Sequence, residues 1–238
     1  MKIAIIGAME EEVELLRSRI EEKETTMAGN SEYTSGKLNG ADVMLLKSGI
    51  GKVNAAMSTA VLLDRFNPDA VINTGSAGGF DSDHEIGTVV ISSEVRHHDV
   101  DATVFGYEYG QVPQLPPAFM ADSRLMEAAR KAVEDIGEHA LAEGLIVTGD
   151  TFMSDADRVA RVRELFPDAL ASEMEAAAVA QVCHQFGVPF VVIRALSDIA
   201  GKESAMSFDE FLPKAAKHSA EAVMRAVSNL QDSHGIIG

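Results

Sequence analysis

The 238-residue sequence predicts an α/β fold, with a mixed but largely parallel central sheet covered by helices on both faces. Two observations carry this prediction. Apolar runs typical of buried strands alternate with segments of helical periodicity along almost the whole chain. The pair Asn39-Gly40, between two strand-like flanks, is typical of a tight hairpin and adds antiparallel pairing early in the chain.

The elements follow from these patterns in chain order. Apolar runs that end at glycine or at polar residues predict strands at Lys2–Gly7, Ala70–Gly79, Thr88–Val95, Gly144–Gly149 and Val191–Asp198, and the hairpin covers Tyr33–Lys47. Helical spacing predicts helices at 8–20, Asn54–Phe66, Ala121–Ile136 (capped by Asp122), Ser154–Phe166, Ala176–Phe186 and Phe208–Leu230. No linker divides the chain, so we expect one domain over 1–238, with a frayed tail over 231–238.

Composition and charge restrict the partners. Apolar residues make up 46% of the chain, which is enough for a sizeable core. The formal net charge of −17 repels polyanions, so we expect neither nucleic acid nor an anionic membrane as a partner, whereas a neutral or cationic small molecule remains compatible. No apolar run reaches the roughly 18 residues of a membrane-spanning helix.

The single cysteine and the N-terminus suggest a cytoplasmic protein. Cys183 has no second cysteine to pair with, which fits a reducing compartment. It lies inside a helical pattern, so we expect a packing role in preference to a nucleophilic one. The N-terminus begins as a strand, without the basic region and apolar core of a signal peptide.

Two sequence features resemble cofactor motifs without matching them. The segment Ser48–Val53 contains Gly-Lys, but Leu46 stands where a P-loop needs glycine and Val53 where it needs Ser or Thr. A dinucleotide fingerprint fails at Asn54. The pair His97-His98 suggests a metal site, but adjacent residues on a strand point to opposite faces, so we expect no metal.

Acidic residues gather where two predicted strands end. Glu173 and Glu175 flank Met174 at a strand-to-helix junction, and the strand from Val191 ends in Arg, Ser and Asp198. Ligands bind outside the carboxyl ends of strands in open α/β sheets, so these residues are candidates for a reaction centre. The alternative is that the glutamates are solvated first-turn residues and that Asp198 is a turn residue or helix cap.

Six segments together resemble the bacterial 5′-methylthioadenosine/S-adenosylhomocysteine nucleosidases, in order and over nearly the whole chain. They are Gly7–Glu12, Lys47–Lys52, Asn73–Gly79, Phe105–Gln111, Glu173–Ala176 and Arg194–Asp198. The resemblance implies a nucleoside phosphorylase-like, three-layer α/β/α sandwich. It also implies a homodimer that hydrolyses the N-glycosidic bond of methylthioadenosine and S-adenosylhomocysteine, releases adenine and needs no metal or organic cofactor.

The resemblance also implies a catalytic role for several residues. Adenine leaves as a neutral molecule only if N7 is protonated, while the ribose becomes an oxocarbenium-like cation. Asp198, held by Ser197, resembles the acid that delivers this proton, and burial near other carboxylates would raise its pKa. Glu175 resembles the residue that binds the ribose hydroxyls. Glu12 resembles the base that activates water, and the water is placed by the residues Arg194 and Ser76.

Further residues resemble the family's substrate-binding positions. By this resemblance, Phe152 would stack on the purine, the backbone of Met153 would read the adenine edge, Met174 would pack under the ribose, and Gly78 would line the base and sugar site. The resemblance also implies that Met9, Ile50 and Phe208 form the pocket for the 5′-alkylthio group. From the second subunit it is reached by Phe105 and Pro113.

Two other functions remain open at this point. A phosphorylase would need fixed cations for phosphate, and its relatives generally place arginine in the first loop and before the second glycine loop. Here those places hold Met9–Glu12 and Asn73. A nucleoside-binding module on the same fold could keep Phe152 and Met174 without needing three acids.

Overall fold

The computed structural model describes residues 1–80, 84–201 and 204–235. Its strands are β1 (Lys2–Gly7), β2 (Glu21–Ala28), β3 (Ser31–Leu38), β4 (Ala41–Lys47), β5 (Ala70–Gly79), β6 (Val89–His97), β7 (Phe119–Met120), β8 (Leu141–Thr148), β9 (Ala169–Glu173) and β10 (Phe190–Ile199). Its helices are α1 (Glu10–Arg19), α2 (Lys52–Phe66), the 3-10 turn η1 (Thr103–Phe105), α3 (Ser123–Ile136), α4 (Ala156–Leu165), α5 (Ala176–Phe186) and α6 (Ser204–Gly235).

The strands form one mixed sheet in the order β10-β6-β8-β9-β5-β1-β4-β3-β2. β10 also pairs with β5, so β5, β9, β8, β6 and β10 close into a ring. The pairings β1–β4, β1–β5, β5–β10, β6–β8 and β8–β9 are parallel. β1, β4, β5 and β10 therefore run in one direction, and their carboxyl ends meet at a common edge, where a ligand site is expected. β6, β8 and β9 run the other way, because β6–β10 and β5–β9 are antiparallel.

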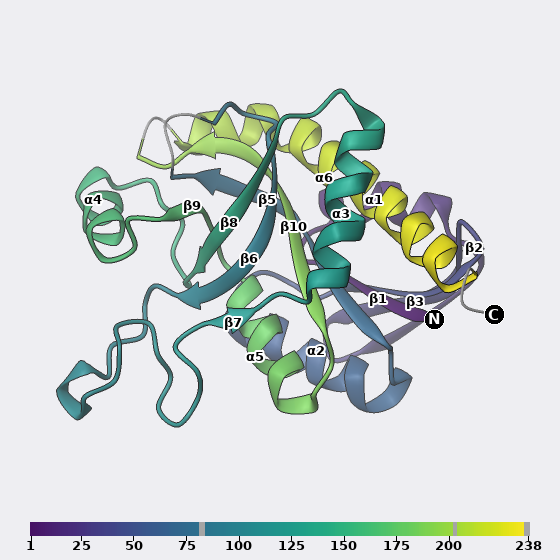
Figure 1. Cartoon of the computed structure of the whole chain (residues 1–238), viewed down its shortest axis with the longest axis horizontal. Helices are drawn as coiled ribbons and strands as arrows, with labels where there is room; N and C mark the ends of the chain where they lie inside the picture. Colours follow the sequence, from purple (N-terminus) through teal and green to yellow (C-terminus); the bar gives the residue numbers. More distant parts are fainter. Residues whose placement is uncertain (81–83, 202–203, 236–238) are drawn as a thin grey trace.

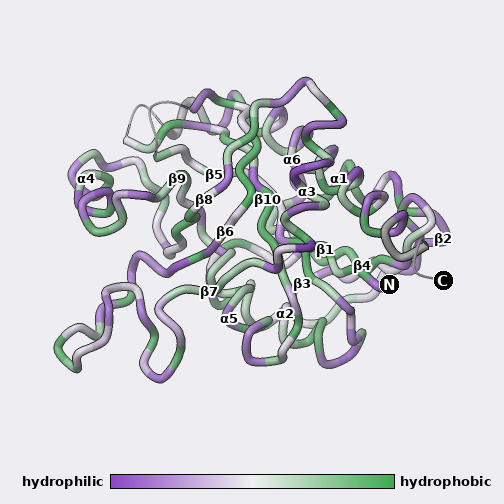
Figure 2. The backbone as a smooth tube through the Cα atoms, viewed as in Figure 1, coloured by the Kyte–Doolittle hydropathy of each residue, from purple (hydrophilic) through white to green (hydrophobic). Residues whose placement is uncertain are grey.

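Helices cover both faces of the sheet, which confirms the three-layer prediction. α1, α3 and α6 lie on one face, and α2 and α5 lie on the other (Figure 1). One apolar core lies under α1, α3 and α6, and a second lies under α2 and α5. Figure 2 shows hydrophobic residues along the central strands between these layers. Within the described residues, no helix has the length and apolar character needed to cross a membrane.

Several local predictions are confirmed. The hairpin joins β3 to β4, and Asn39 and Gly40 at its turn have φ values of 49° and 82°. The side chain of Asp122 accepts hydrogen bonds from the first backbone N–H groups of α3. Cys183 is fully buried, and burial raises the pKa of its thiol to about 12, so it packs as an apolar group.

The largest differences from the sequence-based elements are the strand β2 and the bounds of the last helix. β2 was not predicted, because its sequence, EEKETTMA, has no apolar run; it is an exposed edge strand that pairs with β3 alone. The last helix begins at Ser204 and extends to Gly235, beyond the predicted start of the frayed tail at Gln231. Residues 236–238 of that predicted tail lie outside the described residues.

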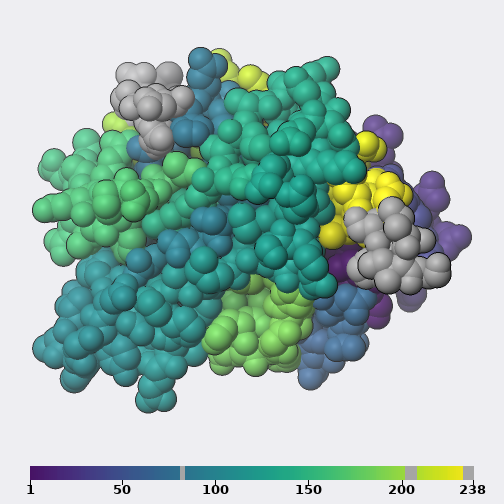
Figure 3. Space-filling view, viewed as in Figure 1, coloured from purple at the N-terminus to yellow at the C-terminus, as the bar shows by residue number. Residues whose placement is uncertain are grey.

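The segment between β6 and β7 stands out from the body of the molecule. It carries η1 and forms the projection at the lower left of Figures 1 and 3. Val104 and Phe105 at its tip are 85% and 79% exposed. These two large apolar side chains lie next to each other on the surface of the segment.

Candidate active site

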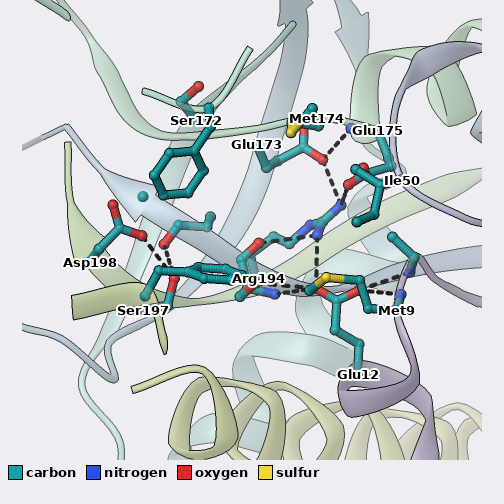
Figure 4. Close-up of a pocket in the computed structure, with 16 residues that line it drawn as sticks. Met9, Glu12, Ile50, Ser172, Glu173, Met174, Glu175, Arg194, Ser197 and Asp198 are labelled. Atoms are coloured by element: carbon teal, nitrogen blue, oxygen red, sulfur yellow. Dashed lines mark hydrogen bonds and ion pairs between the residues drawn. The ribbon is translucent and has the colours of Figure 1, made fainter. Parts of the chain in front are cut away.

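A cavity of about 210 Å³ lies at the carboxyl ends of the parallel strands. It brings together most of the predicted site residues, from segments far apart in the sequence (Figure 4). Those that line it are Met9, Glu12, Ile50, Ser76, Gly78, Phe152, Met174, Glu175, Arg194, Ser197, Asp198 and Phe208. Met153 lines a smaller adjoining cavity of about 30 Å³ together with Phe152 and Asp198.

Arg194 lies at the centre of a buried acidic cluster. Its Nη2 atom lies 2.5 Å from an oxygen of Glu173 and 3.2 Å from one of Glu175, and its Nη1 atom lies 3.7 Å from Glu12. Arg194 is 1% exposed, and it also donates to the side chain of Asn73. One guanidinium among three carboxylates leaves two surplus negative charges when all three are ionised, so this side of the cavity favours a developing cation.

Glu12 is held in place by four donors. Its Oε1 atom accepts from the backbone N and the Oγ of Ser76, at 3.0 and 3.2 Å. Its Oε2 atom accepts from the backbone N of Ala8 and Met9, at 2.8 and 3.2 Å. Gly75 makes the close approach of Glu12 possible, because a Cβ there would lie 2.4 Å from Oε1 and its φ of 143° suits glycine.

Glu175 is buried between the acidic cluster and the loop before α2. Its Oε1 atom accepts from the backbone N of Gly51 at 2.8 Å, and its Oε2 atom faces Arg194. Burial raises the pKa of Glu175 to about 8; the Arg194 guanidinium opposes this rise, and the charges of Glu173 and Glu12 add to it. A bound cation beside this carboxyl would favour its ionised form.

Glu173 is a site residue to which the sequence patterns assign no specific role. It accepts from Arg194 and from the Oγ1 of Thr148, and its Oε2 atom accepts from the backbone N of Glu175 and Ala176 at 2.8 Å. Glu173 and Glu175 are 6% and 4% exposed, so the alternative of solvated first-turn residues is wrong for both. The sequence signal that points to Glu173 is Arg194 at the end of a strand, because an arginine buried in the fold needs carboxylate partners.

Asp198 lies across the cavity from the acidic cluster (Figure 4). Its Oδ1 atom accepts from the Oγ of Ser197 at 2.9 Å. Burial raises the pKa of Asp198 to about 6, against the lowering effect of the Ser197 hydroxyl. The expected contribution of nearby carboxylates to this rise is wrong: burial is its cause, and the glutamates lie on the other side of the cavity.

Aromatic side chains form another wall of the cavity. The rings of Phe152 and Phe208 meet edge to face, with centroids 5.6 Å apart. Phe152 is 38% exposed, which leaves its ring available for stacking. Next to it, the carbonyl of Met153 accepts from the backbone N of Gly201 at 3.1 Å, so this loop is fixed from behind.

Two predicted site residues lie away from the cavity of their own chain. Phe105 and Pro113 are exposed on the projecting segment between β6 and β7. The adjacent histidines also have separate surroundings: His97 pairs with the side chain of Gln181 at 3.0 Å, whereas His98 lies against Gly149. The described part of the chain contains no group of three or more His, Cys, Asp or Glu side chains arranged to hold a metal ion.

Comparisons with known proteins agree with this geometry. A family model described as the phosphorylase superfamily matches residues 2–228. A relative from Lysinibacillus sphaericus (strain C3-41), named 5'-methylthioadenosine/S-adenosylhomocysteine nucleosidase, is 64% identical over 230 residues, covering 97% of this chain and 100% of the relative.

Solved structures of proteins with that name are also similar to this chain. The Neisseria meningitidis protein in complex with methylthio-immucillin-A has a TM-score of 0.93 and 50% identity, covering 95% of this chain and 98% of that one. The Colwellia psychrerythraea 34H protein in complex with adenine has a TM-score of 0.95 and 51% identity, covering 97% and 96%.

Proposed function

Because the chain belongs to the 5′-methylthioadenosine/S-adenosylhomocysteine nucleosidases of the phosphorylase superfamily, we infer that it hydrolyses the N-glycosidic bond of both nucleosides. The products are adenine and the 5-thio-substituted ribose. The observation that carries this function is the two-sided cavity, with Asp198 on one side and a buried acidic cluster on the other. When a purine departs from a sugar, an acid is needed beside the purine and negative charge is needed beside the sugar, at opposite ends of the bond that breaks.

In the proposed first step, protonated Asp198 donates its proton to N7 of the purine. The bond between C1′ and N9 breaks, its electron pair moves to N9, and adenine leaves as a neutral molecule. A carboxyl with a pKa of about 6 retains a proton far more often near neutrality than an ordinary aspartate does. The Ser197 hydroxyl, which donates to Oδ1, fixes the orientation of the carboxyl.

In the proposed second step, Glu12 takes a proton from a water molecule whose oxygen bonds to C1′. Ser76 and Arg194 lie next to Glu12 and hold it in one orientation. Glu175 binds the ribose hydroxyls, and the surplus negative charge around Arg194 stabilises the oxocarbenium-like sugar. Phe152 and the backbone of Met153 hold the purine, and Met9, Ile50 and Phe208 surround the alkylthio group, in keeping with their places on the cavity wall.

A homodimer is part of the proposal. Phe105 and Pro113 lie outside their own chain's cavity, on a segment that projects from the body. On α2, next to the Ile50 rim, Val53 and Met57 are 77% and 46% exposed. We propose that the projecting segment of one subunit packs near this rim and completes the partner's alkylthio pocket. We also propose a cytoplasmic location, where the free thiol of Cys183 would persist.

The test is release of adenine from methylthioadenosine in phosphate-free buffer, repeated with added phosphate. Hydrolysis should proceed equally in both, because Arg194, the cation among the described residues that line the cavity, is already surrounded by carboxylates and offers phosphate no free donor pair. Strict dependence on phosphate would support a phosphorylase instead. Tight binding of the nucleoside without turnover would support a binding module.

A further inference from the structure

Three charged residues outside the cavity form a closed set of contacts, which we call the clasp: Lys52, Asp99 and Asp150. The Nζ atom of Lys52 lies 2.5 Å from Oδ1 of Asp99. The Oδ2 atom of Asp99 accepts from the backbone N of Asp150 at 3.0 Å, and Oδ1 of Asp150 accepts from the backbone N of Lys52 at 2.7 Å. The clasp therefore ties together the loops that follow β4, β6 and β8.

The loops joined by the clasp carry parts of the proposed site. Gly51 precedes Lys52, and its backbone N donates to Glu175 at 2.8 Å. Ile50, one residue earlier, lines the cavity. On the other loop, Phe152 and Met153 follow Asp150 within three residues. A shift of either loop would therefore change the distance between the sugar side and the purine side of the cavity.

The local backbone makes this fixation necessary. α2 begins at Lys52, and its N-cap, Gly51, has no side chain to accept a hydrogen bond from the first turn. Asp150 supplies the missing acceptor from a different loop, at the end of the helix that attracts negative charge. Gly51 has a φ of 92°, and a Cβ there would lie 3.0 Å from Oδ1 of Asp150, so glycine permits the contact.

We propose that the clasp is a positioning device for the reaction: it fixes Gly51 so that Gly51 orients Glu175, and it sets the spacing between Ile50 and Phe152. This inference rests on the proposed function. Lys52, Asp99 and Asp150 do not line the cavity, so they act through Glu175 and the two loops rather than on the substrate. A merely structural ion pair at the surface would contribute little to stability and nothing to turnover.

The experiment compares Lys52→Met and Asp150→Ala with the wild-type chain, with Lys52→Arg as the conservative variant that retains a cation. The matched control is Lys37→Met, because Lys37 also forms an ion pair, at 2.7 Å with Asp42, but on β3 and away from the cavity. Two readouts are used. Amide hydrogen exchange at Gly51 in the ligand-free protein reports the hold on the loop, and steady-state kinetics with methylthioadenosine report kcat and KM separately.

In Lys52→Met and Asp150→Ala, exchange at Gly51 should be about tenfold faster. In the same variants, kcat should fall about tenfold with KM within about threefold of the wild type, because a slightly misplaced carboxylate costs rate before it costs binding. Lys52→Arg and Lys37→Met should match the wild type in both readouts. Unchanged exchange, or faster exchange with unchanged kcat, would overturn the proposal. A wild-type chain without turnover would refute the proposed function, and exchange at Gly51 would still decide whether the clasp holds the loop.

Discussion

Replacement of Asp198 by asparagine should make the protein inactive and more stable at the same time. Asparagine has nearly the same shape but no proton to give to N7. At pH 7, a carboxyl with a pKa of about 6 is protonated in about one molecule in ten, against roughly one in 1,600 for an aspartate with its ordinary pKa of 3.8. We expect turnover of methylthioadenosine to fall by more than about a hundredfold in Asp198→Asn.

The stability effect follows from the same raised pKa. The folded state binds the Asp198 proton more tightly than the unfolded state does. Proton binding therefore contributes fully to the free energy of unfolding of the wild type below pH 3.8, and this contribution is lost as the pH rises to about 6. A shift from 3.8 to about 6 corresponds to about 3 kcal/mol, and Asp198 is only 3% exposed, so solvent screening is small. Asparagine stays neutral and avoids this loss.

The assay is urea denaturation of wild type and Asp198→Asn at pH 4, 6 and 8, with adenine release measured on the same samples. The free energy of unfolding of the variant should exceed that of the wild type by about 3 kcal/mol at pH 8 and by little at pH 4. If the difference in the free energy of unfolding between variant and wild type did not change with pH, burial would not be raising the pKa of Asp198. Near-normal turnover in the variant would refute the assignment of Asp198 as the acid.

Three further predictions follow from the site. Glu12→Gln should lower turnover of methylthioadenosine by more than about a hundredfold, since the amide cannot take a proton from water. The circular dichroism spectrum and the molecular mass in solution should stay unchanged. Substantial remaining turnover would show that Glu12 is not the base. Glu173→Ala should lower the free energy of unfolding, measured in urea, by about 3 kcal/mol, because Arg194 and the backbone N–H groups of Glu175 and Ala176 lose a buried acceptor. Glu173→Gln should retain most of the stability. An equal loss of stability in both variants would show that the charge of Glu173 alone is responsible. Phe105→Ala, or dilution to monomer, should raise KM for methylthioadenosine more than for adenosine, which lacks the alkylthio group; an active monomer with unchanged KM would exclude a shared pocket.

Much of the fold was predictable because apolar runs report burial directly. The individual apolar strands, the Asn39-Gly40 hairpin and the Asp122 cap depend on residues close together in the sequence. The strand β2 could not be predicted from apolar residues, because an edge strand needs no apolar face. The ring closure of β10 on β5 escaped because strand pairing between distant segments depends on the packing of the whole sheet.

The site was predictable as a set of residues but not as a network. Strand-end positions placed Glu175 and Asp198 at one edge of the sheet, and the resemblance added Glu12. Glu173 was not assigned because spacing alone does not show which carboxylate faces a buried guanidinium. The cause of the raised pKa of Asp198 also needed the structure, since it depends on which groups lie across the cavity.

One strand, β10, carries both Arg194 and Asp198, and it is hydrogen-bonded to β5 along one side and to β6 near its middle. A register shift between Leu196 and Asp198 turns the end of the strand relative to its beginning. Inserting or deleting a single residue between Arg194 and Asp198 would turn one of these two side chains out of the cavity, although the strand would remain apolar. Natural relatives should therefore vary in length at the projecting segment, and hardly ever within this five-residue stretch.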